Sequence, residues 1–140
     1  MRRQALELSE KVLGPEHPRT LTSMNGLANS LSRQGKHEAA EKMHRQTLEL
    51  REKVNGPEHP ETLMSINNLA TSLDSQGKHE AAEKMHRQTL ELREKVLGPE
   101  HPHILMSMNN LAFSLSHQGK HEAARELGQR ARELRKSNNE

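Results

Sequence analysis

The feature that most constrains this chain is an internal repeat with a period of 42 residues. The segment Gly-Pro-Glu-His-Pro begins at residues 14, 56 and 98, and the segment Gln-Gly-Lys-His-Glu-Ala-Ala begins at residues 34, 76 and 118. In the frame that starts at Leu6, units 6–47 and 48–89 agree at 33 of 42 positions, and a third unit spans 90–131. Tandem units of this length stack on one another and share one core. We therefore expect a single repeat domain over residues 1–140.

Each unit predicts a hairpin of two helices. Proline concentrates in the Gly-Pro-Glu-His-Pro segments, which must be loops, and Pro18 suits the first position of a helix. Apolar residues then recur at three- and four-residue spacing until Gly35 ends this helix. We expect the apolar face of the second helix to reach Val54 and Gly56 to take a left-handed conformation after it. Because Pro57 has no N–H for the second bond of a Schellman motif, we expect the simpler αL cap. The expected helices are 18–34, 37–54, 60–76, 79–96, 102–118 and 121–136, after a partial helix over 1–13 and before a C-terminal cap over 132–140.

The composition agrees with a stacked array and excludes several other classes of protein. Only 31% of the residues are hydrophobic, so one hairpin cannot fold alone and stacking must join the thin apolar faces. The absence of cysteine excludes disulfide scaffolds and thiolate metal sites. No apolar run is long enough for a membrane span, and the N-terminus has no apolar stretch of a signal peptide, so we expect a cytoplasmic protein. The sequence predicts an all-α solenoid of helical hairpins.

These motifs resemble those of a known family. The pattern Leu-x-x-Met-Asn-Gly-Leu-Ala-x-Ser-Leu-x-x-Gln-Gly-Lys-His-Glu-Ala-Ala-Glu is similar to tetratricopeptide repeats, and the 42-residue unit resembles that of kinesin light chains. The resemblance implies a superhelix whose concave groove is lined by the first helix of each unit. His37 and His44 depart from the pattern, because the family usually has tyrosine there, and this predicts looser packing. The resemblance implies packing roles for Leu27, Ala28, Gly35, Ala40 and Thr47.

The sequence carries no motif of an enzyme or of a cofactor site. Both glycine-rich phosphate-binding patterns are absent. His37 and Glu41 lie one helical turn apart and could share a metal ion, but the third unit has Arg125 at the place of the glutamate. We therefore expect these histidines to begin a helix at the repeat interface, with no metal, cofactor or catalytic residue. We do not expect nucleic acid as a partner, because the net charge is only +2 and stacking aromatic residues are lacking.

The differences between the copies indicate where a partner would bind. The first two units differ at nine positions, seven of which lie on the first helix, and most of these fall opposite its apolar stripe. A recognition surface varies in this way, although exposed positions also tolerate drift. We expect Met106 and Phe113 to contact an apolar side chain of the partner, Arg33 an acidic one and Asp74 a basic one. The candidate groove residues are Thr22, Asn25, Asn29, Arg33, Met64, Asn67, Thr71, Asp74, Met106, Asn109, Phe113 and His117.

One position of this stripe is the same in every unit, namely Asn25, Asn67 and Asn109. A ladder of amides spaced by one repeat can donate to and accept from the backbone of an extended peptide. The alternative is that the asparagines bond neighbouring helices and brace the array. Both interpretations are consistent with the sequence.

The two ends of the chain suggest a second role. The sequence starts in the middle of a helix, so we expect a fragment of a longer array, and its apolar edge of Leu6, Leu8, Val12 and Leu13 favours end-to-end self-association. The altered last helix, with Gly128 in place of a histidine, is typical of a terminal cap. We expect a non-enzymatic scaffold that binds a protein or an extended peptide. The alternative is a structural, self-associating segment, and nucleic-acid binding is a more distant one.

Overall fold

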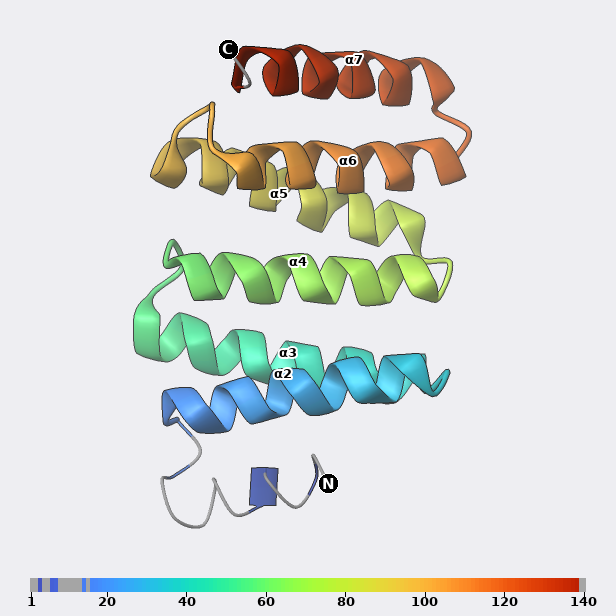
Figure 1. Cartoon of the computed structure of the whole chain (residues 1–140). Helices are drawn as coiled ribbons and strands as arrows, with labels where there is room; N and C mark the ends of the chain where they lie inside the picture. Colours follow the sequence, from blue (N-terminus) through green and yellow to red (C-terminus); the bar gives the residue numbers. More distant parts are fainter. Residues whose placement is uncertain (1–2, 4–5, 8–13, 15, 139–140) are drawn as a thin grey trace.

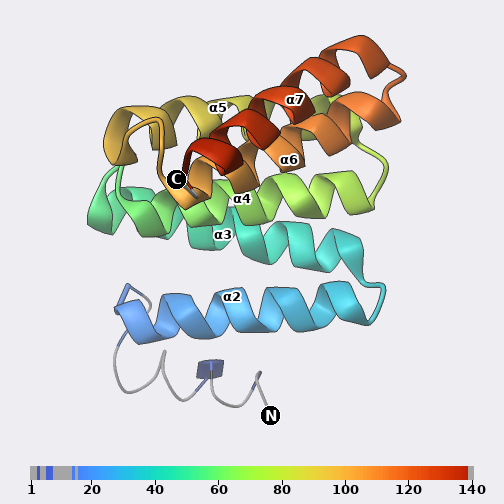
Figure 2. The same ribbon diagram turned by 45° about the horizontal axis from the view of Figure 1, so that its top comes forward.

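The computed structural model describes residues 3, 6, 7, 14 and 16–138, and the regular secondary structure of these residues is all helical. Consecutive helices form three antiparallel hairpins, α2 with α3, α4 with α5 and α6 with α7, which stack in the order of the sequence (Figures 1 and 2). This confirms the predicted all-α solenoid. The helices are α2 Pro18–Arg33, α3 His37–Asn55, α4 Pro60–Ser75, α5 His79–Leu97, α6 Pro102–His117 and α7 His121–Asn138.

The first helix of each unit begins at its proline, as predicted, and is capped by the histidine before it. The ring Nδ1 of His59 accepts the backbone N–H of Glu61 at 3.1 Å. His17 and His101 make the same contact in the other two units. A side-chain acceptor at this position satisfies one of the free N–H groups of the first turn. The repeated Gly-Pro-Glu-His-Pro segment therefore supplies both the cap and the first helical residue.

The first helix ends at Gly35 in a tight reversal. Gly35 has a φ of 81°, which favours glycine, and its N–H donates to the carbonyl of Ser32 at 3.0 Å. The next N–H, of Lys36, reaches back to the carbonyl of Leu31 at 2.9 Å. These two bonds define a Schellman motif, and they recur at Gly77 and Gly119.

The cap at the end of the second helix differs from the prediction in its backbone conformation. Gly56 has a positive φ of 88°, as expected, but its ψ is 166° and not the value near +47° of the left-handed region. The cause is Pro57, since a residue before proline is driven to extended ψ values. The N–H of Gly56 donates to the carbonyl of Glu52 at 2.9 Å, which is the single bond of the simpler cap.

The core consists of three clusters of small and apolar side chains that lie between the helices. Leu27, Ala28, Ala40 and Thr47 are all buried, which agrees with the packing roles that the resemblance implies. The prediction for Val54 was wrong, because this side chain is 42% exposed. With 19 residues, α3 is longer than the 16-residue helices α2 and α4, so its last turn extends beyond them.

Polar contacts hold successive hairpins together. The guanidinium of Arg93 is only 1% exposed, and its Nη1 donates to Ser107 Oγ on the next helix at 2.9 Å. Arg51 makes the same bond to Ser65 at 2.8 Å. Exposed ion pairs add to these contacts, such as the one between Lys53 of α3 and Glu16 in the loop before α2.

The apolar edge predicted at the N-terminus differs from the expectation where the structure describes it. Leu6 is buried and packs against the core cluster that contains Leu21 and Leu31. Leu8, Val12 and Leu13 lie outside the described residues. At the other end, α7 buries Leu127 and Ala131 against α6, so the altered helix completes the third hairpin.

Candidate functional site

The first helices α2, α4 and α6 are neighbours in the stack (Figure 1), and we call the accessible surface that they share the first-helix face. Ten of the twelve predicted groove residues keep part of their side chain accessible on it, whereas Asn67 and Asp74 are buried. Two large apolar side chains stand out, since Phe113 is 51% exposed and Met106 is 44% exposed. The exposed residues are Thr22, Arg33, Thr71, Met106, Asn109, Phe113 and His117, and the half-buried ones are Asn25, Asn29 and Met64.

Two of the three repeated asparagines accept hydrogen bonds from an asparagine of the next unit. Asn68 Nδ2 donates to Asn25 Oδ1 at 2.8 Å, and Asn110 Nδ2 donates to Asn67 Oδ1 at 2.9 Å. Asn25 and Asn67 therefore join neighbouring helices, as in the alternative in which the asparagines brace the array. Asn109 is the exposed member of the set.

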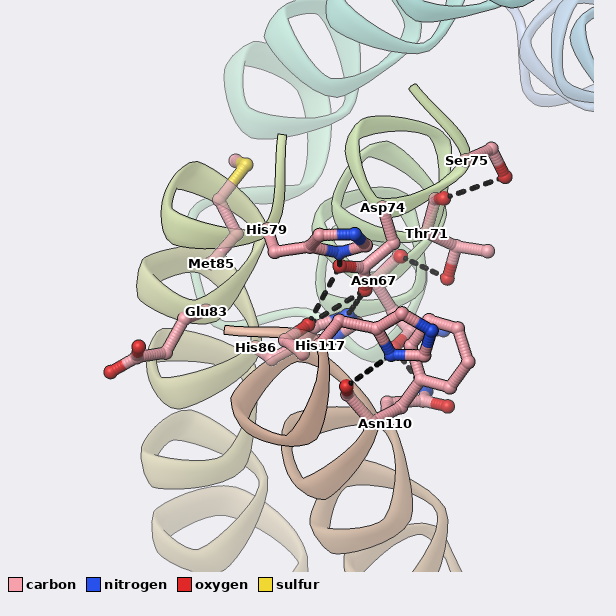
Figure 3. A network of polar contacts seen from close by, with 12 residues as sticks. Asn67, Thr71, Asp74, Ser75, His79, Glu83, Met85, His86, Asn110 and His117 are labelled. Atoms are coloured by element: carbon pink, nitrogen blue, oxygen red, sulfur yellow. Dashed lines mark hydrogen bonds and ion pairs between the residues drawn. The ribbon is translucent and has the colours of Figure 1, made fainter. Parts of the chain in front are cut away.

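Asp74 is the centre of a buried polar network (Figure 3). Its carboxylate lies 2.8 Å from His79 Nδ1 and 3.1 Å from His86 Nε2, and it accepts the hydroxyl of Ser114 at 2.7 and 2.9 Å. Burial alone would raise the pKa of this carboxyl, but the hydrogen bonds from His86, His79 and Ser114 hold the pKa below its ordinary value. Asp74 is therefore an anion at neutral pH. We call this group the second junction, because it joins α4, α5 and α6.

The equivalent first junction, which joins α2, α3 and α4, has no carboxylate. Ser32 stands in place of Asp74, and its Oγ lies 3.4 Å from His37 Nδ1. His44 is only 3% exposed, so burial, aided by the charge of Arg51, lowers its pKa to about 4. Ser72 Oγ is buried without a hydrogen-bond partner among the described residues. Of the two histidines that depart from the family pattern, His44 is buried and His37 is half-buried.

Two cavities open beside Phe113. One, of about 250 Å³, lies between α4 and α6 above Asp74 and His86. The other, of about 620 Å³, lies between α6 and α7 and is lined by Arg125 and Arg132. The Phe113 ring stands between the two cavities, with the His117 ring 4.1 Å from it. We call the exposed side chains of Met106 and Phe113 the apolar ridge. The first-helix face thus has this ridge, with an acidic cavity on one side of Phe113 and a basic cavity on the other.

The pair considered for a metal ion has other partners. The carboxylate of Glu41 accepts from Gln76, Lys78 and Arg45 at 2.8 to 3.3 Å, and these bonds hold its pKa at about 2. Over residues 3, 6, 7, 14 and 16–138, no three carboxylate or imidazole groups are arranged to bind a metal ion. None of the described helices combines the length and apolar character that a membrane crossing requires.

Comparisons with known proteins agree with this geometry. A tetratricopeptide-repeat family model matches residues 1–53, 28–95 and 75–137. A variant of a Podospora anserina putative kinesin light chain with nearly identical TPR-like repeats is 28% identical, with a TM-score of 0.86 over 99% of this chain. BtubC (BKLC) from P. vanneervenii, at 23% identity and a TM-score of 0.89, matches over 99% of this chain and 55% of its own length, and shows the fold alone.

A third structure, the TPR domain of Arabidopsis FLU, is 20% identical with a TM-score of 0.73, over 84% of this chain and 95% of that domain. No curated protein matches. The chain spans 65% of the length of the Podospora protein. The family match covers nearly all of the sequence, and the fold and the repeat period agree with it. This chain belongs to the tetratricopeptide-repeat family.

Proposed function

We propose that this chain binds a segment of another protein on its first-helix face. Tetratricopeptide repeats are general protein-interaction scaffolds, and the fold is typically non-enzymatic. The observation that carries the proposal is the exposure of Phe113 and Met106 on this face. Large apolar side chains that remain exposed together mark surfaces that a partner covers.

The chemistry of the face favours an extended partner segment. Phe113 and Met106 are seven residues apart on α6, which places them on one side of the helix, with the exposed amide of Asn109 between them. Apolar side chains of the partner would pack on this ridge, while its backbone would bond the amide. Arg33 at the exposed end of α2 would attract an acidic side chain.

The sequence variation between units supports the same surface. Thr22, Met64 and Met106 are equivalent positions, as are Asn29, Thr71 and Phe113, and all six keep accessible surface. The second helices of the first two units are identical from His37 to Val54 and from His79 to Val96. The scaffold is thus constant, while the first-helix face differs from unit to unit.

The experiment compares capture of proteins from a cell extract by the chain and by two double variants. Met106→Ser with Phe113→Ser removes the apolar ridge, and the matched control, Val54→Ser with Val96→Ser, removes two similarly exposed side chains from the second helices. We expect a protein that the unchanged chain and the valine variant retain and that the ridge variant loses. Circular dichroism would verify equal helicity. Retention of the same proteins by all three versions, or by none, would contradict the proposal.

The asparagines are unsuitable for this test. Substitution of Asn25 or Asn67 by alanine would remove bonds between neighbouring helices, to Asn68 and Asn110 respectively. A loss of binding would then have two explanations. Only Asn109 can be changed to alanine without loss of such a bond among the described residues.

A further inference from the structure

The cavity above Asp74 is the part of the first-helix face with the most specific chemistry. It has a volume of about 250 Å³, which is large enough for one long side chain, and it opens beside the exposed ring of Phe113. Three successive helices, α4, α5 and α6, contribute residues to it. Its lining residues are Thr71, Asp74 and Ser75 of α4, His86 of α5, and Asn110 and Phe113 of α6.

The floor of this cavity carries a negative charge without a permanent cation beside it. The donors to Asp74 are the imidazoles of His79 and His86 and the hydroxyl of Ser114, and no lysine or arginine of the described residues bonds it. An ionised carboxylate offers about four lone-pair sites. His79 and Ser114 contact Oδ1, and His86 and Ser114 contact Oδ2, but the one hydroxyl hydrogen of Ser114 is shared between the two oxygens, so only three donor hydrogens serve the carboxylate that lines the cavity.

The rim of the cavity is aromatic. The ring of His117 lies 4.1 Å from that of Phe113 and 4.8 Å from that of His79. Phe113 also makes an edge contact with His79 at 6.4 Å. Cations are attracted to the faces of aromatic rings, and the planar guanidinium of arginine stacks on them while it donates to a carboxylate. A charged floor and an aromatic rim together fit an arginine side chain.

We propose that this cavity holds an arginine side chain of the partner segment. The guanidinium donates to the carboxylate of Asp74 at the floor of the cavity and stacks against Phe113, while the aliphatic part of the side chain fills the cavity. This inference rests on the proposed function and adds the chemistry of one partner residue to it. Desolvation of the carboxylate by the bound side chain strengthens the attraction between the two charges.

The first junction provides an internal contrast. There Ser32 replaces Asp74, Arg33 replaces Ser75 and Thr71 replaces Phe113. That position therefore lacks both the anion and the aromatic ring, and it adds a cation that repels a second one. Two of these changes are among the nine differences between the first two units, and the change from Thr71 to Phe113 lies between the second and third units, so all three act on the same property. The array holds one arginine-binding cavity, between α4 and α6, within the described residues.

The test uses Phe113 as its own reporter. Because the chain has one phenylalanine, 4-fluorophenylalanine labelling gives a single fluorine resonance at this cavity. The probes are N-acetyl-arginine methylamide and the uncharged N-acetyl-citrulline methylamide, titrated at pH 7.5. We expect a saturable shift with arginine and at least tenfold weaker binding of citrulline. Equal shifts with both probes would overturn the proposal. N-acetyl-lysine methylamide should bind more weakly than arginine, and equal affinity would overturn the stacking on Phe113.

Three variants separate binding from folding. Asp74→Asn should lower the affinity for the arginine probe at least tenfold. Ser114→Ala, which removes one hydrogen bond to Asp74 but keeps its charge, should retain binding. Ser75→Arg copies the first junction at an exposed position without touching Asp74, and it should also abolish binding, with Ser75→Ala as its control. Unchanged arginine affinity in Asp74→Asn or in Ser75→Arg would refute the assignment.

Failure of this inference and failure of the proposed function give different results. The probes bind without any partner protein, so a saturable arginine shift supports the cavity even if no protein is captured. If the ridge variant loses a captured protein while the arginine probe gives no shift, the first-helix face is the binding surface and the arginine assignment is wrong.

Discussion

Replacement of Asp74 by serine would convert the second junction into a copy of the first. The substitution removes the acceptor for His79, His86 and Ser114. Hydrogen bonds to a charged group contribute about 1.5–3 kcal/mol each. Three of them amount to roughly 4–9 kcal/mol, and relief of the buried carboxylate offsets several kcal/mol of this. We therefore expect Asp74→Ser to lower the free energy of unfolding by about 2–4 kcal/mol.

Urea unfolding followed by circular dichroism measures this change, and thermal unfolding should show a fall in Tm of roughly 10 °C for a chain of this size. The reciprocal variant, Ser32→Asp, supplies an acceptor for His37, His44 and the partnerless Ser72 hydroxyl. It should stabilise the chain by about 1–2 kcal/mol, because desolvation of the new carboxylate offsets part of the gain. A change of under 1 kcal/mol in Asp74→Ser, or a loss in both variants, would refute this reasoning.

Three further predictions concern local features of the repeat. His59→Ala should cost about 1 kcal/mol of stability in thermal unfolding, because the N–H of Glu61 loses its cap, and His59→Asn should restore most of this. Gly77→Ala should lower the free energy of unfolding by about 1 kcal/mol because the φ of Gly77 is 80°. Gly128→Ala, inside α7 with open space around it, should raise that free energy by about 0.5–1 kcal/mol. A similar effect of both variants in urea unfolding would contradict this. Since the folded-state pKa of His44 is about 4 and its ordinary value is 6.5, the unfolded chain binds the proton first, so about 3 kcal/mol of stability is lost as the pH falls from 6.5 to 4. His44→Gln should reduce that loss in urea titrations at several pH values, and an unchanged loss would show that the histidine is not its cause.

The helices could be predicted from the sequence because local signals mark their ends. Pro18 suits the first position of a helix because its φ is fixed and no N–H is needed there, and Gly35 can end one because glycine adopts a positive φ at little cost. These signals act within a few residues and need no tertiary contact. The ψ of Gly56 was mispredicted because the proline after it competes with the helical cap.

The second junction could not be predicted because its residues come together only after the units stack. On the helical wheel Asp74 lies with the exposed stripe, but Ser114, forty residues later, covers it from α6. Arg93 is buried for the same reason, since the next hairpin packs over it. Alignment of the repeats does give one signal of this site. Asp74 stands at the place of Ser32, while the histidines near it, His79 and His86, are the same in the first unit.

The central claim is that the partner lies on the first-helix face, and site-directed photo-crosslinking tests it most directly. A benzophenone crosslinker placed at Phe113 reports on this face, and the same group at Val96, which is 39% exposed on α5, reports on the second helices. With the protein captured by the unchanged chain, the account predicts a crosslinked product from position 113 and none from position 96. Crosslinking from position 96 alone, or from both positions equally, would contradict it.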